Sequence, residues 1–156
     1  MSPGLRRDLR RVVCGLILRG RMIMFVGATR NYPGLHHNDR VAQARGGAEG
    51  FFLQNNSCLM LWERVVSDWM GIHGRVTSCT FRITNFHLAG DIIHVGGMIN
   101  KKWQENGLNL VELLMQSDTP RRVGMTGNVI VALPSTKYPT TTPMWDLDGK
   151  ATVVCQ

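Results

Sequence analysis

The sequence lacks an apolar run long enough to cross a membrane and lacks the paired cysteines of a zinc site. A spanning helix needs roughly 18 apolar residues in a row, and the best candidate, residues 12–26, is broken by Arg19 and Arg21. No small-residue cleavage site follows this stretch, so it does not fit a secretory signal peptide. The four cysteines are scattered without a CxxC pair, which fits neither zinc nor a dense disulfide framework. We expect a cytoplasmic protein with reduced thiols, no metal and no membrane partner.

Aromatic residues are also scarce, at 7% of the chain, and they are not interleaved with the basic residues. No nucleic-acid motif is visible, so the net charge of +7 does not indicate a nucleic-acid partner. Residues 1–21 hold six arginines and one aspartate, so much of the basicity is N-terminal. This patch either attracts a phosphorylated carrier such as coenzyme A or is a solvated leader, and the sequence leaves both interpretations open.

With 156 residues, of which 44% are hydrophobic and 19% charged, the chain has the size and composition of one folded domain. We divide it into a basic N-terminal segment with the first strand (1–21), the main domain (22–134) and an irregular C-terminal tail (135–156). The tail contains two prolines and three consecutive threonines.

The apolar pattern predicts an α+β fold. Residues 12–18 are typical of a strand, and residues 39–44 of a short helix. In residues 51–70 apolar positions recur at three- and four-residue spacing on two faces, which predicts a long helix wrapped by a sheet and stopped by Gly71. After this helix the sequence predicts four strands, at residues 75–86, 91–103, 108–116 and 124–133. Turns are predicted at residues 104–107 and 119–122. The expected order is one strand, a loop, a buried helix and an antiparallel meander.

The loop NYPGLHHND, residues 31–39, is the unusual part of the sequence. Tyr32-Pro33-Gly34 cannot lie inside a helix, and two histidines and an aspartate on irregular backbone are typical of functional loops. The other histidines have no metal-ligand spacing, so we assign them structural or surface roles. Asn55-Asn56-Ser57, at the front of the long helix, either lines a substrate tunnel or caps the helix.

Four stretches, in order, resemble the MaoC-like enoyl-thioester hydratases, whose fold is the hot-dog, an antiparallel sheet wrapped around one long central helix. ATRNYPGLHHND and VSDWMG (residues 66–71) resemble segments of the small hydratase subunits of bacterial steroid side-chain degradation. AGDIIHVGGMI and VGMTGNVIVALP resemble two later strands of that family. The likeness covers roughly residues 22–134.

The resemblance implies reversible addition of water across the 2,3 double bond of an acyl thioester, with R stereochemistry at carbon 3 and no cofactor. The family holds and deprotonates the water with an aspartate and a histidine in D-x-N-P-x-H. Here the histidine falls on His36, but the aspartate position reads Asn31 and the family asparagine is replaced by Pro33. An amide can hydrogen-bond water but cannot accept its proton. The chemistry would then depend on His36 alone or on another base, for which Asp39 is a candidate.

The resemblance also implies that a backbone N–H at the start of the long helix, from Gln54 or Asn55, stabilises the enolate oxygen. We expect substrate contacts from Gln54, Asn55, Asn56, His37 and Asp39. The leading hypothesis is a hydro-lyase for a bulky enoyl thioester of coenzyme A or a carrier protein, acting as a homodimer or with a second hot-dog chain. The alternatives are a non-catalytic partner subunit of a heteromeric hydratase and an altered chemistry such as cyclisation or isomerisation.

Overall fold

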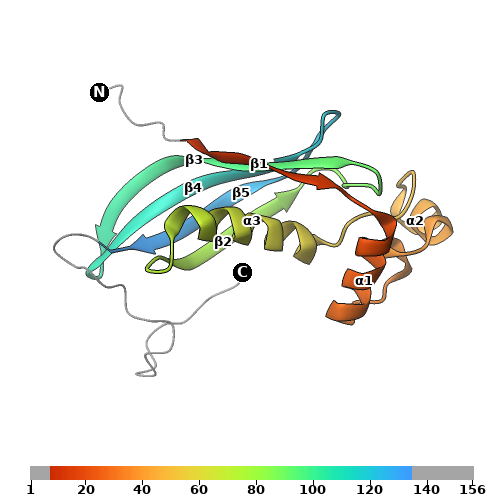
Figure 1. Ribbon diagram of the computed structural model, residues 1–156, viewed down its shortest axis with the longest axis horizontal. Coiled ribbons are helices and arrows are strands. Elements are labelled where there is room, and N and C mark those ends of the chain that lie inside the picture. The colour runs from red at the N-terminus through yellow and green to blue at the C-terminus, as the bar shows by residue number, and fades with distance from the viewer. Residues whose placement is uncertain (1–7, 135–156) are drawn as a thin grey trace.

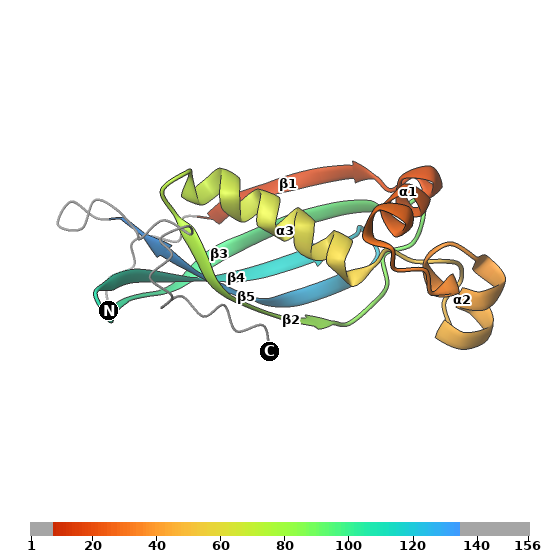
Figure 2. The same cartoon turned by 90° about the horizontal axis from the view of Figure 1, so that it is seen from below.

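The computed structural model describes residues 8–134, with side chains from residue 16 onward, so the predicted tail at 135–156 lies outside the described residues. The helices are α1 (Arg19–Thr29), the 3₁₀ turn η1 (Gly34–His36), α2 (Asp39–Gly46) and α3 (Asn55–Met70). The strands are β1 (Asp8–Leu16), β2 (Arg75–Ile83), β3 (Ile92–Glu105), β4 (Leu108–Asp118) and β5 (Val123–Leu133). Figures 1 and 2 show α3 lying along the inner face of one curved sheet, as predicted.

The sheet is antiparallel, with strand order β1-β3-β4-β5-β2. The predicted turn between β3 and β4 is confirmed, and its Asn106 and Gly107 both have positive φ, 50° and 78°, as a tight hairpin turn requires. The prediction that the last four strands form a meander is wrong for the first of them, β2. β2 pairs with β5 at the far edge and not with β3. A glycine permits this pairing, because a Cβ at Gly127 would lie 2.0 Å from the carbonyl oxygen of Thr80.

The long helix α3 begins at Asn55, four residues later than predicted. Residues 51–54 are extended because this segment pairs with the chain before β3. Phe52 bridges Leu88, and the N–H of Leu53 donates to the carbonyl of His87 at 2.8 Å. At the other end Gly71 caps the helix with φ 71°, as expected.

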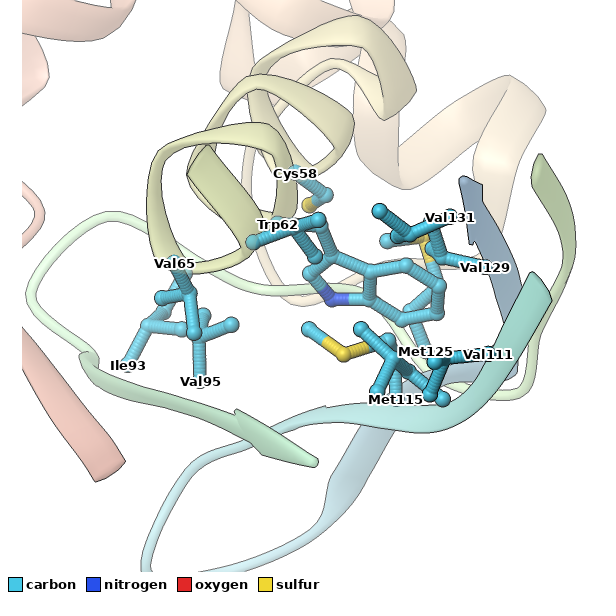
Figure 3. Packing of buried hydrophobic residues seen from close by; sticks show 12 residues of the cluster. Cys58, Trp62, Val65, Ile93, Val95, Val111, Met115, Met125, Val129 and Val131 are labelled. Carbon is cyan, nitrogen blue, oxygen red and sulfur yellow. The ribbon is translucent and has the colours of Figure 1, made fainter. Parts of the chain in front are cut away.

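The buried face of α3 packs on the sheet around Trp62, which is 1% exposed. Figure 3 shows the indole inserted among side chains of β4 and β5. This cluster holds Met115, Met125, Val111, Val129 and Val131 beside Trp62. Burial of an indole and two long methionines fills the inner face of the sheet, and this packing fixes the orientation of α3.

The helix α1 is the element that the sequence did not predict, since residues 21–29 were expected to lead directly into a loop. It packs with α2 and the segment before α3, and these elements share a second, smaller core of Met22, Ala42, Phe51 and Phe52. In Figure 2 α1, η1 and α2 gather beside the amino end of α3. No helix in residues 8–134 is long and apolar enough to span a membrane.

Candidate active site

His36 is held at the end of η1, where Pro33 (φ −55°) starts a single 3₁₀ turn. Its Nδ1 lies 3.0 Å from the carbonyl oxygen of Phe52, and its ring meets the Phe52 ring edge-on at 5.2 Å between centroids. A carbonyl can only accept, so Nδ1 carries the proton of the neutral ring and Nε2 keeps its lone pair. Nε2 of the half-buried imidazole is therefore the nitrogen that can accept a hydrogen bond.

Phe52 is a rigid support for this histidine. Its ring stacks on Phe86 at 3.9 Å between centroids, and its N–H donates to the carbonyl of Leu35 at 3.2 Å. The ring and the backbone of Phe52, which both contact His36, are thus held by half-buried neighbours. Backbone and aromatic contacts with Phe52 therefore orient the imidazole.

Gln54 ties the other end of the same loop to α3. This residue is only 2% exposed, and its Nε2 donates to the backbone carbonyl of Asn31 at 3.0 Å. The Thr29 hydroxyl lies 3.1 Å from Oε1 of Gln54 and 2.8 Å from the carbonyl of Phe25, and its one proton serves either acceptor. Asn31 and His36 are consequently held by Gln54 and Phe52, which lie two residues apart on the segment that leads into α3. The side-chain amide of Asn31 makes no hydrogen bond within residues 16–134, which leaves it open to a ligand.

The first turn of α3 adds hydrogen-bond donors. Gln54 is the N-cap residue, and its carbonyl accepts from the N–H groups of Ser57 and Cys58. The N–H groups of Asn55 and Asn56 precede these and have no intrahelical acceptor, as at the start of any helix. Both asparagine side chains are exposed. The positive end of the helix dipole reinforces these donors toward a developing anion.

The two other residues predicted to bind substrate are engaged differently. Asp39 accepts from the N–H of Phe51 at 3.0 Å and pairs with Arg19, and these two contacts, in that order, hold the pKa of Asp39 below its ordinary value. Both carboxylate oxygens are thus used away from His36. His37 is exposed and directly follows η1. No carboxylate in the described part of the chain hydrogen-bonds to His36.

Sequence reasoning did not single out His87, although it lies at the same end of α3. The ring is 3% exposed, its Nε2 lies 3.1 Å from Oγ of Ser117, and burial lowers the pKa of His87. It packs against Gly124, where a Cβ would lie 2.1 Å from its Cε1. Only the pairing of residues 52–53 with 87–88 brings it to the site, and no local pattern indicates that pairing. Among the residues that the structure describes, no group of His, Cys, Asp and Glu could hold a metal ion.

Comparison with known proteins identifies the fold. No protein-family model and no curated protein matches the sequence. The ChsH1-ChsH2 complex from Mycobacterium tuberculosis matches with a TM-score of 0.73 and 18% identity over 85% of this chain and 99% of that one. The (R)-hydratase from A. caviae involved in PHA biosynthesis gives 0.71 and 13% over 86% and 99%. The MaoC-like dehydratase from Rhodospirillum rubrum gives 0.67 and 15% over 86% and 95%. The chain therefore has the hot-dog fold that these MaoC-like hydratases and dehydratases share.

Proposed function

We propose that this chain is a MaoC-like hydro-lyase that adds or removes water at the 2,3 double bond of an acyl thioester, with His36 as the acid and base. One observation carries the proposal. The Nδ1–H of His36 is anchored on the Phe52 carbonyl three residues before α3, so the segment that leads into the helix start also holds the imidazole. Hydration needs this combination of a base for water and donors for the enolate oxygen.

The reaction would proceed in two proton transfers through the same imidazole. Nε2 of His36 takes a proton from water as the water oxygen bonds to carbon 3, and the electron pair of the double bond moves onto the thioester carbonyl oxygen. The N–H of Asn55 stabilises that oxygen at the positive end of α3. The imidazolium then returns its proton to carbon 2. Asn31 supplies an amide that orients the water, because it cannot accept the proton itself.

The test is hydration of a 2-enoyl-coenzyme A by the purified protein, followed as loss of the enoyl-thioester absorbance. We expect His36→Ala to lower the rate by about 10²–10⁴-fold, the usual contribution of a general acid or base. Asn31→Asp should raise the rate, because it supplies a proton acceptor at the position where the D-x-N-P-x-H segment has its aspartate. His73→Ala is the matched control, since His73 is an exposed histidine after α3. Hydration that survives His36→Ala would refute the assignment.

A second candidate is a non-catalytic subunit that completes a heteromeric hydratase, with a second hot-dog chain supplying the missing base. The observation that favours it is that Asn31 replaces the family aspartate while Asp39 is already paired with Arg19 and Phe51. The ChsH1-ChsH2 structure is itself a complex of two differently named chains. This candidate predicts an inactive protein that gains hydration activity when co-expressed with the second chain. A homodimer that hydrates enoyl thioesters alone would exclude it.

An altered chemistry that needs no water-activating base, such as isomerisation or cyclisation, is the remaining alternative. It shares the imidazole and the helix-start donors with the hydratase proposal. Mass analysis of the product separates the two reactions, because isomerisation retains the mass of the substrate and hydration adds one water.

A further inference from the structure

A separate apolar pocket lies between α1 and α3, outside the His36 site. It has a volume of 270 Å³. Its walls come from β1, α1, the segment before α3, α3 itself and β3, and they consist of Leu16, Ile17, Arg21, Met22, Phe25, Leu53, Ser57, Met60, Leu61 and Ile93. We call this the α1–α3 pocket. None of His36, Asn31, Gln54 or Asn55 lines it, so its chemistry is distinct from that of the proposed active site.

Two polar groups in the lining have no partner of their own. Ser57 is 8% exposed, and its hydroxyl makes no hydrogen bond within the described residues. A buried hydroxyl without a partner is unfavourable, so this one is available for an oxygen of a bound molecule. Arg21 is exposed, is the one charged residue of the lining, and forms no ion pair within residues 16–134. The apolar walls and this cation together favour a ligand with an apolar body and an anionic head.

The rim supports the same conclusion. Leu16 and Met60 line the pocket yet are 50% and 54% exposed. Apolar side chains gathered around a concave site are typical of surfaces that bind a partner or ligand. The volume lies close to the lower limit of about 300 Å³ for small-molecule sites, which suits a small ligand.

We propose that the α1–α3 pocket binds an aliphatic carboxylate, with the chain packed between Met22, Phe25 and Leu61 and the carboxylate paired with Arg21. The bound chain covers apolar surface that is otherwise open to water, and the carboxylate supplies acceptors for the guanidinium. Binding requires no turnover, so this site stands or falls independently of the proposed hydratase activity.

The test is calorimetric titration of the whole protein with sodium octanoate and, in parallel, with 1-octanol, which has the same chain without the charge. We expect saturable binding of octanoate with a negative heat-capacity change, the marker of apolar burial. Arg21→Gln should weaken octanoate binding about two- to fivefold, the range for an exposed ion pair, and leave octanol binding unchanged. Arg45→Gln, which changes an exposed arginine on α2, is the matched control and should alter neither titration.

Ser57→Leu provides the complementary variant, because a larger apolar side chain there fills the pocket. It should abolish binding of both ligands, with circular dichroism confirming that the fold is kept. If Ser57→Leu does not fold, the contrast between octanoate and octanol in Arg21→Gln decides the question alone. Absence of saturable octanoate binding overturns the proposal. So does octanoate binding that neither variant weakens. A second copy of the chain could instead close the pocket. In that case octanoate fails to bind, and Met24→Asp converts an oligomer to monomers in sedimentation. This outcome also overturns the proposal.

Discussion

Replacing Gln54 with methionine tests whether one buried amide holds the loop of residues 31–36 against α3. Methionine has a similar length and volume, so Gln54→Met removes the polar contacts and leaves little void. It eliminates the 3.0 Å bond from Nε2 to the Asn31 carbonyl and the alternative acceptor of the Thr29 hydroxyl. The Thr29 proton keeps its bond to Phe25 at 2.8 Å, so the Asn31 carbonyl is the group left without a partner.

The expected loss follows from these contacts. A net intramolecular hydrogen bond contributes about 0.5–1.5 kcal/mol, and an abandoned buried acceptor costs about 1–3 kcal/mol. Asn31 is only half-buried, so water can partly replace the lost donor. We expect the free energy of unfolding to fall by about 1–3 kcal/mol. We also expect hydration activity to fall further than stability alone explains, because Asn31 lies at the start of the loop that carries His36.

Urea denaturation followed by tryptophan fluorescence measures the stability, and the enoyl-thioester assay measures the activity at a temperature where the variant is folded. Gln43→Met is the matched control, because the exposed Gln43 also makes one side-chain bond to a backbone carbonyl, that of Glu49 at 2.9 Å. It should change the free energy of unfolding by less than about 0.5 kcal/mol. If Gln54→Met and Gln43→Met are equally stable, Gln54 does not hold the loop.

Three further outcomes follow from the packing and from one pKa. Gly124→Ala should lower the free energy of unfolding by about 2–4 kcal/mol in urea denaturation, because the added methyl group overlaps the His87 ring and displaces the ring from Ser117. Gly27→Ala is the control, because Gly27 lies in an open position on α1. It should leave the free energy of unfolding unchanged or raise it by up to about 1 kcal/mol. Trp62→Ala should cost about 3–5 kcal/mol, the range for a buried aromatic residue, and a loss below 1 kcal/mol would contradict the packing described for α3. Burial lowers the pKa of His87, so at acidic pH the unfolded chain binds a proton more readily than the folded chain does. Stability should therefore fall as the pH drops below about 6.5. Unfolding curves measured over this range should show a smaller loss of stability in His87→Gln than in the unsubstituted protein.

Local patterns in the sequence were sufficient for most of the elements but not for their pairing. The spacing of apolar residues located α3, and the turn Asn106-Gly107 located the β3–β4 hairpin, since both depend on neighbours in the chain. The helix α1 was missed because its apolar and β-branched residues fit a strand as well as a helix, and its burial depends on contacts with Phe51 and Ala42. The place of β2 beside β5 rests on a close approach at Gly127, which no local pattern reveals.

In the candidate site, too, local patterns identified some residues, and contacts between distant parts of the chain determined the others. The unusual loop drew attention to its histidines and aspartate, and the resemblance to the D-x-N-P-x-H segment then assigned positions 36 and 31 to His36 and Asn31. The anchoring of His36 by a backbone carbonyl, the loop contact of Gln54 and the burial of His87 were not predictable, because each joins residues at least 16 positions apart. The roles of these residues in binding substrate remain predictions.

Leu53 lines both the α1–α3 pocket and a smaller hollow on the other side of α3, beside His87 and Asn55. The Leu53 side chain therefore separates the pocket from the hollow. The backbone of Leu53 is held by the hydrogen bond from its N–H to the carbonyl of His87. Any substitution of Leu53 that widens the α1–α3 pocket also changes the shape of the hollow beside His87. A change at Leu53 that tunes ligand preference in the α1–α3 pocket would therefore also alter the packing around His87 and Asn55.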